Sequence, residues 1–161
     1  MRRSTFLVAL TVVVAIVVAG IFVVQPMRVV SASMSPTICT GDRVLVNVWH
    51  PEVGQLSRGD LVVVRVPGSD APLVKRVAGL PGDTVGIEDA LLVVNGRRVD
   101  EPYVDHDSID SLYWGPVVVP DDAILVLGDA RAISIDSREF GPVPGDRLVG
   151  RVLARVHLGQ C

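Results

Sequence analysis

Lys75 and a serine-rich segment are the residues whose types and spacing best suit nucleophilic chemistry in this 161-residue chain. Lys75 is the only lysine, since all the other Lys/Arg positions are arginine. Arginine keeps its proton at any accessible pH, whereas burial favours the neutral form of a lysine. Because Lys75 follows the apolar pair Leu73 and Val74, we expect its side chain to lie along a buried strand with a lowered pKa. A neutral amine at this position could serve as a general base.

The segment from Ser31 to Pro36 supplies the hydroxyl groups. A serine oxygen becomes a strong nucleophile only when a neighbouring base removes its proton, and histidine is the usual base. The three histidines lack a triad-like setting: His50 precedes a proline, His106 lies between two aspartates, and His157 is close to the C-terminus. We therefore interpret the serine-rich segment and Lys75 as a candidate serine–lysine pair.

Residues 5–24 form an uncharged apolar run, and a helix of about 20 residues matches the thickness of a bilayer core. Arg2 and Arg3 precede the run with no acidic residue to balance them, which predicts a cytoplasmic N-terminus over residues 1–4. The sequence thus predicts one transmembrane anchor at residues 5–24, with residues 25–161 on the extracytoplasmic side of the cell membrane. A cleaved secretory signal is the alternative, because Ser31-Ala32-Ser33 has a small-x-small pattern. The length of the run favours the retained anchor.

Composition narrows the remaining classes of function. The chain carries 15 Lys+Arg and 18 Asp+Glu residues, and its net charge of -3 argues against a nucleic-acid partner. Cys39 and Cys161 are the only cysteines, and in an oxidising compartment they can pair, stay free or carry another bond. Neither cysteine shows metal-ligand spacing to a histidine, so we expect no metal and no cofactor. The sequence does not define an oligomeric state.

The chain after Pro26 is typical of a single antiparallel β domain. Gly-Asp pairs mark turns, and most of them precede apolar, β-branched runs. Asn95-Gly96 indicates a tight hairpin within residues 91–99, and the polar residues 100–114 are predicted to form an exposed excursion. We predict a mainly β domain, barrel-like or sandwich, behind a single N-terminal transmembrane helix, with strands at residues 43–49, 61–66, 123–127 and 151–156.

Four segments, in order along the chain, resemble the sequence boxes of type I signal peptidases, the membrane-bound Ser/Lys proteases of peptidase family S26. Residues 33–37 (SMSPT) match the nucleophile box S-M-x-P-T, and residues 41–46 (GDRVLV) match the strand box G-D-x-V-x-V. Residues 75–83 (KRVAGLPGD) match every specified position of the lysine box K-R-V-x-G-x-P-G-D. Residues 128–141 are similar to the final box, although Ala130 stands where the family has asparagine.

The resemblance implies a mechanism. Ser33 would attack the scissile carbonyl, and neutral Lys75 would take its proton and later return it to the leaving amine. The Ser31 hydroxyl and the Ser33 backbone N–H would form the oxyanion hole, and Ser134 would orient the lysine amine. The other matching positions would support the site from behind: Asp129, Asp136 and Arg138.

The resemblance and the predicted topology together imply the substrate class. The expected substrates are exported preproteins with signal peptides, bound as an extended strand that has small side chains at the first and third positions before the cut. A nucleophile so close to the predicted anchor would work at the lipid surface. Trp49 and Trp114 are candidates either for the membrane interface or for the core, and Met34 either shields the amine or packs in the core.

Two other functions remain open at this stage. A self-cleaving, repressor-like peptidase would use the same Ser/Lys pair on its own chain in the cytoplasm, and the predicted anchor argues against it. A non-catalytic, membrane-tethered β domain that scaffolds envelope proteins is the more distant alternative, which Ala130 keeps open. Simpler roles in turns or surface ion pairs are the alternative for the charged residues of the boxes: Asp42, Asp83, Asp129, Asp136 and Arg138.

Overall fold

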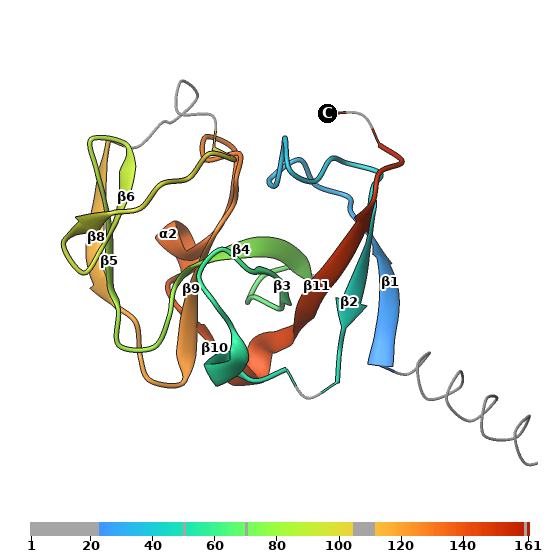
Figure 1. The fold of residues 1–161 in the computed structure, drawn as a ribbon, viewed down its shortest axis with the longest axis horizontal. Coiled ribbons are helices and arrows are strands. Elements are labelled where there is room, and N and C mark those ends of the chain that lie inside the picture. Colours follow the sequence, from blue (N-terminus) through green and yellow to red (C-terminus); the bar gives the residue numbers. More distant parts are fainter. Residues whose placement is uncertain (1–22, 50, 70, 105–111, 160) are drawn as a thin grey trace, which may run out of the picture.

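The computed structural model describes residues 23–49, 51–69, 71–104, 112–159 and 161. These residues form antiparallel β-sheets (Figure 1), so the predicted mainly β fold is confirmed. The strands are β1 (Val24–Arg28), β2 (Arg43–Asn47), β3 (Leu61–Val64), β4 (Leu73–Gly79), β5 (Thr84–Glu88), β6 (Leu91–Val94), β7 (Arg97–Arg98), β8 (Tyr113–Val118), β9 (Ala123–Leu127), β10 (Val143–Pro144) and β11 (Leu148–Val156).

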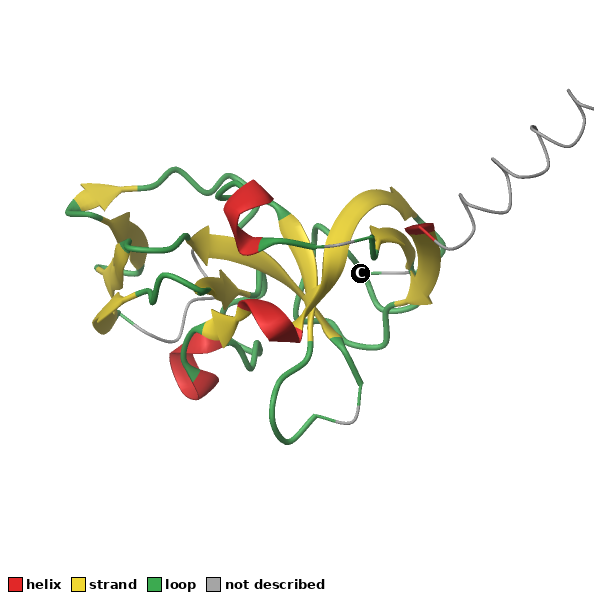
Figure 2. Cartoon of the chain, turned by 90° about the horizontal axis from the view of Figure 1, so that it is seen from below, coloured by secondary structure: helices red, strands yellow, loops and turns green. Residues whose placement is uncertain are grey.

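Helices are short and lie between strands in the described part of the chain (Figure 2). Two single 3-10 turns, η1 (Val53–Gln55) and η3 (Gly145–Arg147), flank the sheet strands, and the four-residue helix α2 (Ser137–Phe140) follows β9. This arrangement agrees with the single β domain predicted from the turns and apolar runs after Pro26.

Seven strands form the larger sheet, in the order β1-β2-β11-β3-β4-β9-β10. Strand β9 is buried along its whole length, because Val126 packs in one hydrophobic cluster while Leu125 and Leu127 pack in another. Burial on both faces explains why this strand is continuously apolar in sequence instead of alternating. Strands β4 and β9 pair directly and form the middle of the molecule between the two ends seen in Figure 1.

Four strands form the smaller sheet, in the order β7-β6-β5-β8. The predicted hairpin is present between β6 and β7, where Asn95 and Gly96 both have positive φ values, 53° and 73°. Both residues favour this left-handed conformation, which closes a two-residue turn that matches the twist of the strands. The small sheet packs against β9 through a cluster that includes Val85, Leu92 and Leu125.

The chain enters the larger sheet at its N-terminal end. Val24 is the first residue of β1 and pairs with Asn47, and the Val48 N–H donates to the Val23 carbonyl. The predicted helix at residues 5–24 therefore ends too late by at least one residue, since Val24 belongs to a strand whose partner is β2. The rest of that prediction lies outside the described residues, among which no helix is long and apolar enough to cross a membrane.

The predicted exposed excursion over residues 100–114 is correct only in part, since Pro102 and Leu112 are exposed but other described residues differ from it. Glu101 and Val104 are buried, and Tyr113 and Trp114 belong to strand β8. The polar character of the segment was misleading because the Glu101 carboxylate is buried against a positively charged partner, Arg131. His106 and its neighbours from 105 to 111 lie outside the described residues.

Cys39 and Cys161 form a disulfide, with their Cα atoms 5.0 Å apart, which decides among the three alternatives for these cysteines. Cys39, Asp42 and His157 offer possible ligand atoms within 4.8 Å of one another, although His157 is far from the other two in sequence. The Cys39 sulfur is bonded to Cys161, and the Asp42 carboxylate accepts three backbone N–H groups. Neither side chain is therefore free to bind a metal ion in this form of the protein.

Candidate active site

Ser33 and Lys75 line the same cleft, which has a volume of about 460 Å³. One wall is the serine loop, which we define as residues 31–40. The connection between β3 and β4, at residues 66–69, forms a second wall, and residues 133–140 form a third. Other lining side chains are Leu73, Ile133, Ile135, Glu139 and Phe140. The cleft is therefore lined by both apolar side chains and polar groups, and Ser33 and Lys75 are among the polar ones.

The main chain of Ser33 is held on both sides. Its carbonyl oxygen accepts the Ala130 N–H at 3.1 Å, and its own N–H donates to the Ser31 hydroxyl oxygen at 3.2 Å. The Ser31 hydroxyl and the Ser33 N–H thus lie next to each other at the edge of the cleft. Two donors in this position can stabilise a negative oxygen once a ligand replaces their mutual hydrogen bond.

Strand β4 directs the Lys75 side chain into the protein, where it is 1% exposed. Its ammonium nitrogen donates to the Ser134 hydroxyl oxygen at 2.9 Å. Burial lowers the pKa of Lys75 from its usual value of 10.5 to about 8, although the Asp136 carboxylate partly opposes this shift. Among the hydrogen bonds between described residues, none joins Lys75 Nζ to the Ser33 hydroxyl.

Gly128 allows the serine loop and Ser134 to approach each other. A Cβ atom at this position would lie 2.1 Å from the Ser134 hydroxyl oxygen and 2.5 Å from the Ser33 carbonyl oxygen. Both distances are far shorter than a van der Waals contact, so a residue with a side chain does not fit here. The absence of a side chain at Gly128 therefore lets Ser134, the hydrogen-bond partner of Lys75, lie close to the main chain of Ser33.

A single sequence family accounts for almost the whole chain. The profile described as "Signal peptidase, peptidase S26" matches residues 2–157. The chain belongs to this signal peptidase family. The resemblance inferred from the four boxes is therefore confirmed, together with the class of enzyme, a serine endopeptidase.

Several curated signal peptidases are similar to the chain over most of their length. Signal peptidase I S of Bacillus subtilis (strain 168) is 40% identical over 149 residues, which cover 85% of this chain and 80% of that protein. Signal peptidase IB of Staphylococcus aureus (strain Mu50 / ATCC 700699) is 38% identical over 154 residues, covering 86% and 80%. A crystal structure of a signal peptidase I from Enterococcus faecalis V583 has a TM-score of 0.53 and 31% identity, covering 62% of this chain and 97% of that chain.

In this signal peptidase, Asp136 is fully buried, so the surface ion pair considered for it is wrong. Its carboxylate accepts the N–H groups of Gly128 at 3.0 Å and Arg138 at 3.1 Å, and it also binds the Arg138 guanidinium at 2.9 Å. Arg138 in turn donates to the carbonyl oxygens of Arg131 at 2.6 Å and Ser134 at 3.2 Å. The pair therefore caps helix α2 and fixes the segment that presents Ser134 to the lysine.

Asp129 is also buried and binds Arg76, the residue after the lysine, through two hydrogen bonds of 2.8 and 2.6 Å. Consecutive residues of a strand point to opposite faces of the sheet, so Lys75 faces the cleft while Arg76 faces the other side. The Arg76 guanidinium also contacts the Thr37 hydroxyl at 3.3 Å and stacks on the Tyr103 ring at 3.7 Å. Arg76 therefore ties the serine loop to the segment that follows β9.

The sequence reasoning missed the buried pair formed by Glu101 and Arg131. Two hydrogen bonds of 2.6 and 2.7 Å join them, and both side chains are about 2% exposed. Arg131 lies in the final sequence box, but no local pattern connects it with an acid 30 residues earlier. The position of Arg76 could have been predicted from the sequence. Side chains alternate between the two faces of a strand, so a strand that directs Lys75 into the site directs Arg76 to the opposite face.

The remaining predictions concern Met34, the two tryptophans and two turn aspartates. Met34 packs in a core cluster with Val29 and Ile38, which favours the core role. Trp114 packs against the core and donates from its indole to the Arg138 carbonyl at 3.2 Å, whereas Trp49 is 61% exposed. Asp83 accepts the Leu80 N–H at 2.8 Å, and Asp42 the Cys39 N–H at 3.0 Å, as expected for turn residues.

Proposed function

We propose that the chain is a membrane-bound serine endopeptidase that removes N-terminal signal peptides from exported preproteins, with Ser33 as nucleophile and neutral Lys75 as general base. The observation that carries the proposal is the Lys75 amine, which shares a cleft with Ser33 and has a pKa near 8 because it is buried. With that pKa, about one amine in ten is neutral at pH 7, compared with about one in several thousand for a solvated lysine.

The reaction we propose begins when the Ser33 hydroxyl oxygen attacks the scissile carbonyl carbon and its proton passes to Lys75 Nζ. The tetrahedral intermediate collapses as Lys75 returns the proton to the leaving amine, and the signal peptide stays attached as an ester. Lys75 then takes a proton from a water molecule that attacks the ester, and gives that proton to the Ser33 oxygen as the signal peptide leaves. The Ser31 hydroxyl and the Ser33 N–H stabilise the oxyanion, about 3–4 kcal/mol for one donor.

Ser134 holds the amine ready for these transfers in our proposal. Its hydroxyl is neutral, so it orients Nζ without stabilising the ammonium form as a carboxylate would. Asp136 and Arg138 support Ser134, and Asp129 supports Arg76, so these residues act on the reaction through others. Substrate binding must close the distance between Ser33 and Lys75, because catalytic hydrogen bonds often tighten only in the bound complex.

We propose that residues 1–4 are cytoplasmic, that the anchor lies within residues 5–23, and that the chain from Val24 onward is the extracytoplasmic peptidase domain. Three exposed apolar side chains near the cleft support work at a lipid surface: Val30 is 71% exposed, Ile133 is 64% exposed and Ile135 is 60% exposed. Exposed apolar side chains near one another are unfavourable in water, whereas the interface of a bilayer accommodates them. The preprotein would enter the cleft as an extended strand with small side chains at the first and third positions before the cut.

Cleavage of a preprotein by the purified full-length chain in detergent tests the proposal. A precursor whose signal peptide ends in Ala-x-Ala should be cut after the second alanine, and mass spectrometry of the products locates the cut. Ser33→Ala, Lys75→Ala and Lys75→Arg should each lower kcat by about 10³-fold or more while the protein stays folded. Ser35→Ala is the matched control, because Ser35 lies in the same loop and should be dispensable.

An inactive wild-type protein would refute the proposal and leave the non-catalytic scaffold. Cleavage confined to the enzyme's own chain, with the precursor intact, would instead support the self-cleaving alternative. Loss of activity in Ser35→Ala equal to that of Ser33→Ala would remove Ser33 from the role of nucleophile.

A further inference from the structure

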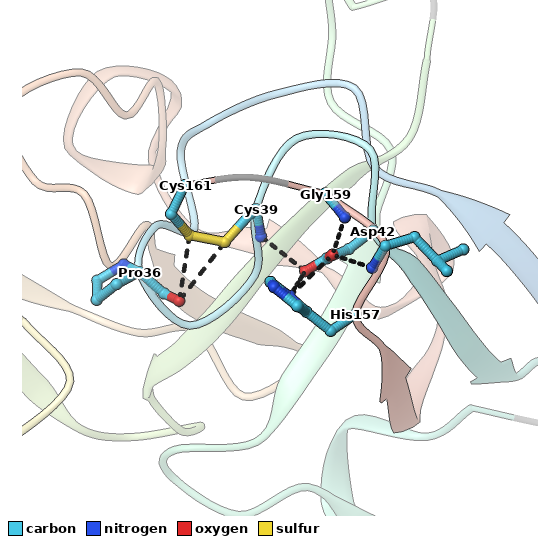
Figure 3. Close-up of a disulfide and its surroundings, with 7 residues drawn as sticks. Pro36, Cys39, Asp42, His157, Gly159 and Cys161 are labelled. Carbon is cyan, nitrogen blue, oxygen red and sulfur yellow. Dashed lines mark hydrogen bonds and ion pairs between the residues drawn. A yellow bond between two sulfur atoms is a disulfide. The ribbon is translucent and has the colours of Figure 1, made fainter.

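The C-terminal tail of the chain, which we define as residues 157–159 and 161, lies directly against the serine loop (Figure 3). The Cys39–Cys161 disulfide closes a separation of 122 residues and joins the last residue of the chain to the loop that contains Ser33. The Pro36 carbonyl oxygen lies 3.8 Å from the Cys39 sulfur and 3.6 Å from the Cys161 sulfur. The disulfide thus packs against the middle of the serine loop as well as binding its end.

Asp42 provides a second connection between the tail and the loop (Figure 3). One of its carboxylate oxygens accepts the Cys39 N–H at 3.0 Å, and the other accepts the N–H groups of Leu158 and Gly159, both at 2.9 Å. The His157 Nδ1 atom lies 3.2 Å from the same carboxylate. These backbone donors, the Cys39 N–H above all, hold the pKa of Asp42 well below its usual range, so the carboxylate stays charged and keeps accepting them.

The tail and the loop fit together at the level of the backbone. A Cβ atom on Gly159 would lie 2.1 Å from the Thr40 carbonyl oxygen, so the tail passes the loop with no room for a side chain. Backbone hydrogen bonds within the loop then connect this contact to the nucleophile: Ile38 donates to Met34 at 2.8 Å, and Ser35 donates to Ala32 at 3.0 Å. These two bonds join the residue before Cys39 to the residues on either side of Ser33.

We propose that Asp42 and the Cys39–Cys161 disulfide are positioning elements for Ser33. The C-terminal tail is then required for efficient catalysis, and reduction of the disulfide slows the enzyme. This inference rests on the proposed function. The effect should fall on kcat, because Ser33 must lie within a fraction of an ångström of its reacting geometry. Substrate binding should change less, since residues 66–69 and 133–140, which form the other walls of the cleft, belong to other elements.

The first experiment compares the full-length enzyme before and after treatment with dithiothreitol, using the Ala-x-Ala precursor. The chain has only two cysteines, so the reductant acts on this one bond. We expect kcat to fall about tenfold or more on reduction, with KM within about twofold, because misplacing a reacting group by about 1 Å costs as much as 10²-fold. Reoxidation should restore the rate. The Cys39→Ser/Cys161→Ser double variant should have the lower rate with and without dithiothreitol.

Asp42→Ala tests the second connection, and Asp146→Ala is its matched control, since Asp146 is exposed in another Gly-Asp turn. We expect Asp42→Ala to lower kcat about tenfold with KM unchanged, whereas Asp146→Ala keeps both values. Circular dichroism and the thermal midpoint, measured on the same samples, confirm that the assayed protein is folded.

The outcomes separate this inference from the proposed function. An untreated wild-type enzyme that cuts nothing refutes the proposed function itself. An active wild-type enzyme whose kcat is unchanged by reduction refutes the positioning role of the disulfide alone. A fall in rate that matches the fraction of unfolded protein, with normal kcat in the folded remainder, also refutes it, because the tail would then contribute only stability.

Discussion

The Ser134 hydroxyl oxygen lies 2.9 Å from Lys75 Nζ and accepts a hydrogen bond from it. Strand pairing explains how residues 59 positions apart meet, since Arg76 of β4 pairs with Leu127 of β9, and the segment that carries Ser134 follows Leu127 directly. Gly128 lets the hydroxyl lie over the strand at this short distance. The register of two buried strands therefore decides where the lysine amine points.

Replacement of this hydroxyl should slow catalysis without weakening substrate binding. We expect Ser134→Ala to lower kcat by about 10²-fold, because the amine loses its only hydrogen bond among the described residues and samples unproductive rotamers. KM should change little. The matched control is Ser137→Ala on the same segment, which removes a hydrogen bond to the Val126 N–H and should cost about 1–3 kcal/mol of stability with kcat unchanged. Equal losses of kcat in both variants would contradict the orienting role.

Activity should rise with pH through the pKa of Lys75. With the neutral amine as the base that we propose, kcat/KM should increase about tenfold per unit below pH 8 and level off above it, with a midpoint near pH 8. Initial rates with a peptide substrate between pH 6 and pH 10 measure this directly. A flat profile from pH 6 to pH 9, or a midpoint near the usual value of 10.5, would contradict a buried lysine base.

Lys75 should also make the enzyme less stable than an inactive variant. The unfolded chain holds the lysine proton up to about pH 10.5 and the folded chain up to about pH 8, so wild-type stability rises with pH between these values. Below pH 8 the buried ammonium costs about 3 kcal/mol. Lys75→Met should therefore be more stable at pH 7, by about 2 kcal/mol once the lost Ser134 hydrogen bond is subtracted.

The advantage of Lys75→Met should shrink as the pH approaches 10, where the wild-type amine is neutral when folded. Denaturant unfolding of both proteins at pH 7 and pH 10 tests this, and other titrating groups cancel in the comparison. A constant difference at the two pH values would show that the lysine is not buried as a charged group at neutral pH.

Removal of one partner of the Glu101–Arg131 pair should lower the stability of the protein. Both side chains are buried, so Glu101→Ala leaves an unpaired guanidinium in the interior and should destabilise the protein by about 3–5 kcal/mol. The double variant Glu101→Leu/Arg131→Met, which removes both charges, should be much closer to the wild type. Thermal unfolding of the single and double variants measures the difference. If the double variant were the least stable, the pair would be a net source of stability, contrary to this expectation.

The sequence predicted much of the fold because strands and turns leave local signals. Strand β9 is present with its predicted bounds, Ala123–Leu127, and Asn95-Gly96 closes a hairpin. Lys75 could be recognised as unusual because it is the only lysine and follows an apolar pair. The resemblance to the family then added Ser33 and Ser134, which lie outside helices and strands and have no distinctive local pattern.

The rest of the site depends on contacts between distant segments, which local patterns do not specify. Nothing near Glu101 indicates that its carboxylate is buried against Arg131, and a polar segment therefore looked exposed. The requirement for Gly128 arises only when two other segments cross above it. The pairing of Cys39 with Cys161 was equally open, since chain separation alone does not bring two sulfurs together.

Strand β1 is bonded into the sheet from its first residue, with Val24 opposite Asn47 and the Val23 carbonyl bound to the Val48 N–H. The described part of the chain is therefore part of the sheet from its start. If the anchor that we propose before this strand lies in a bilayer, the ladder between β1 and β2 would help to set the distance between the cleft and the lipid surface. The depth of the scissile bond relative to the bilayer would then become part of substrate choice.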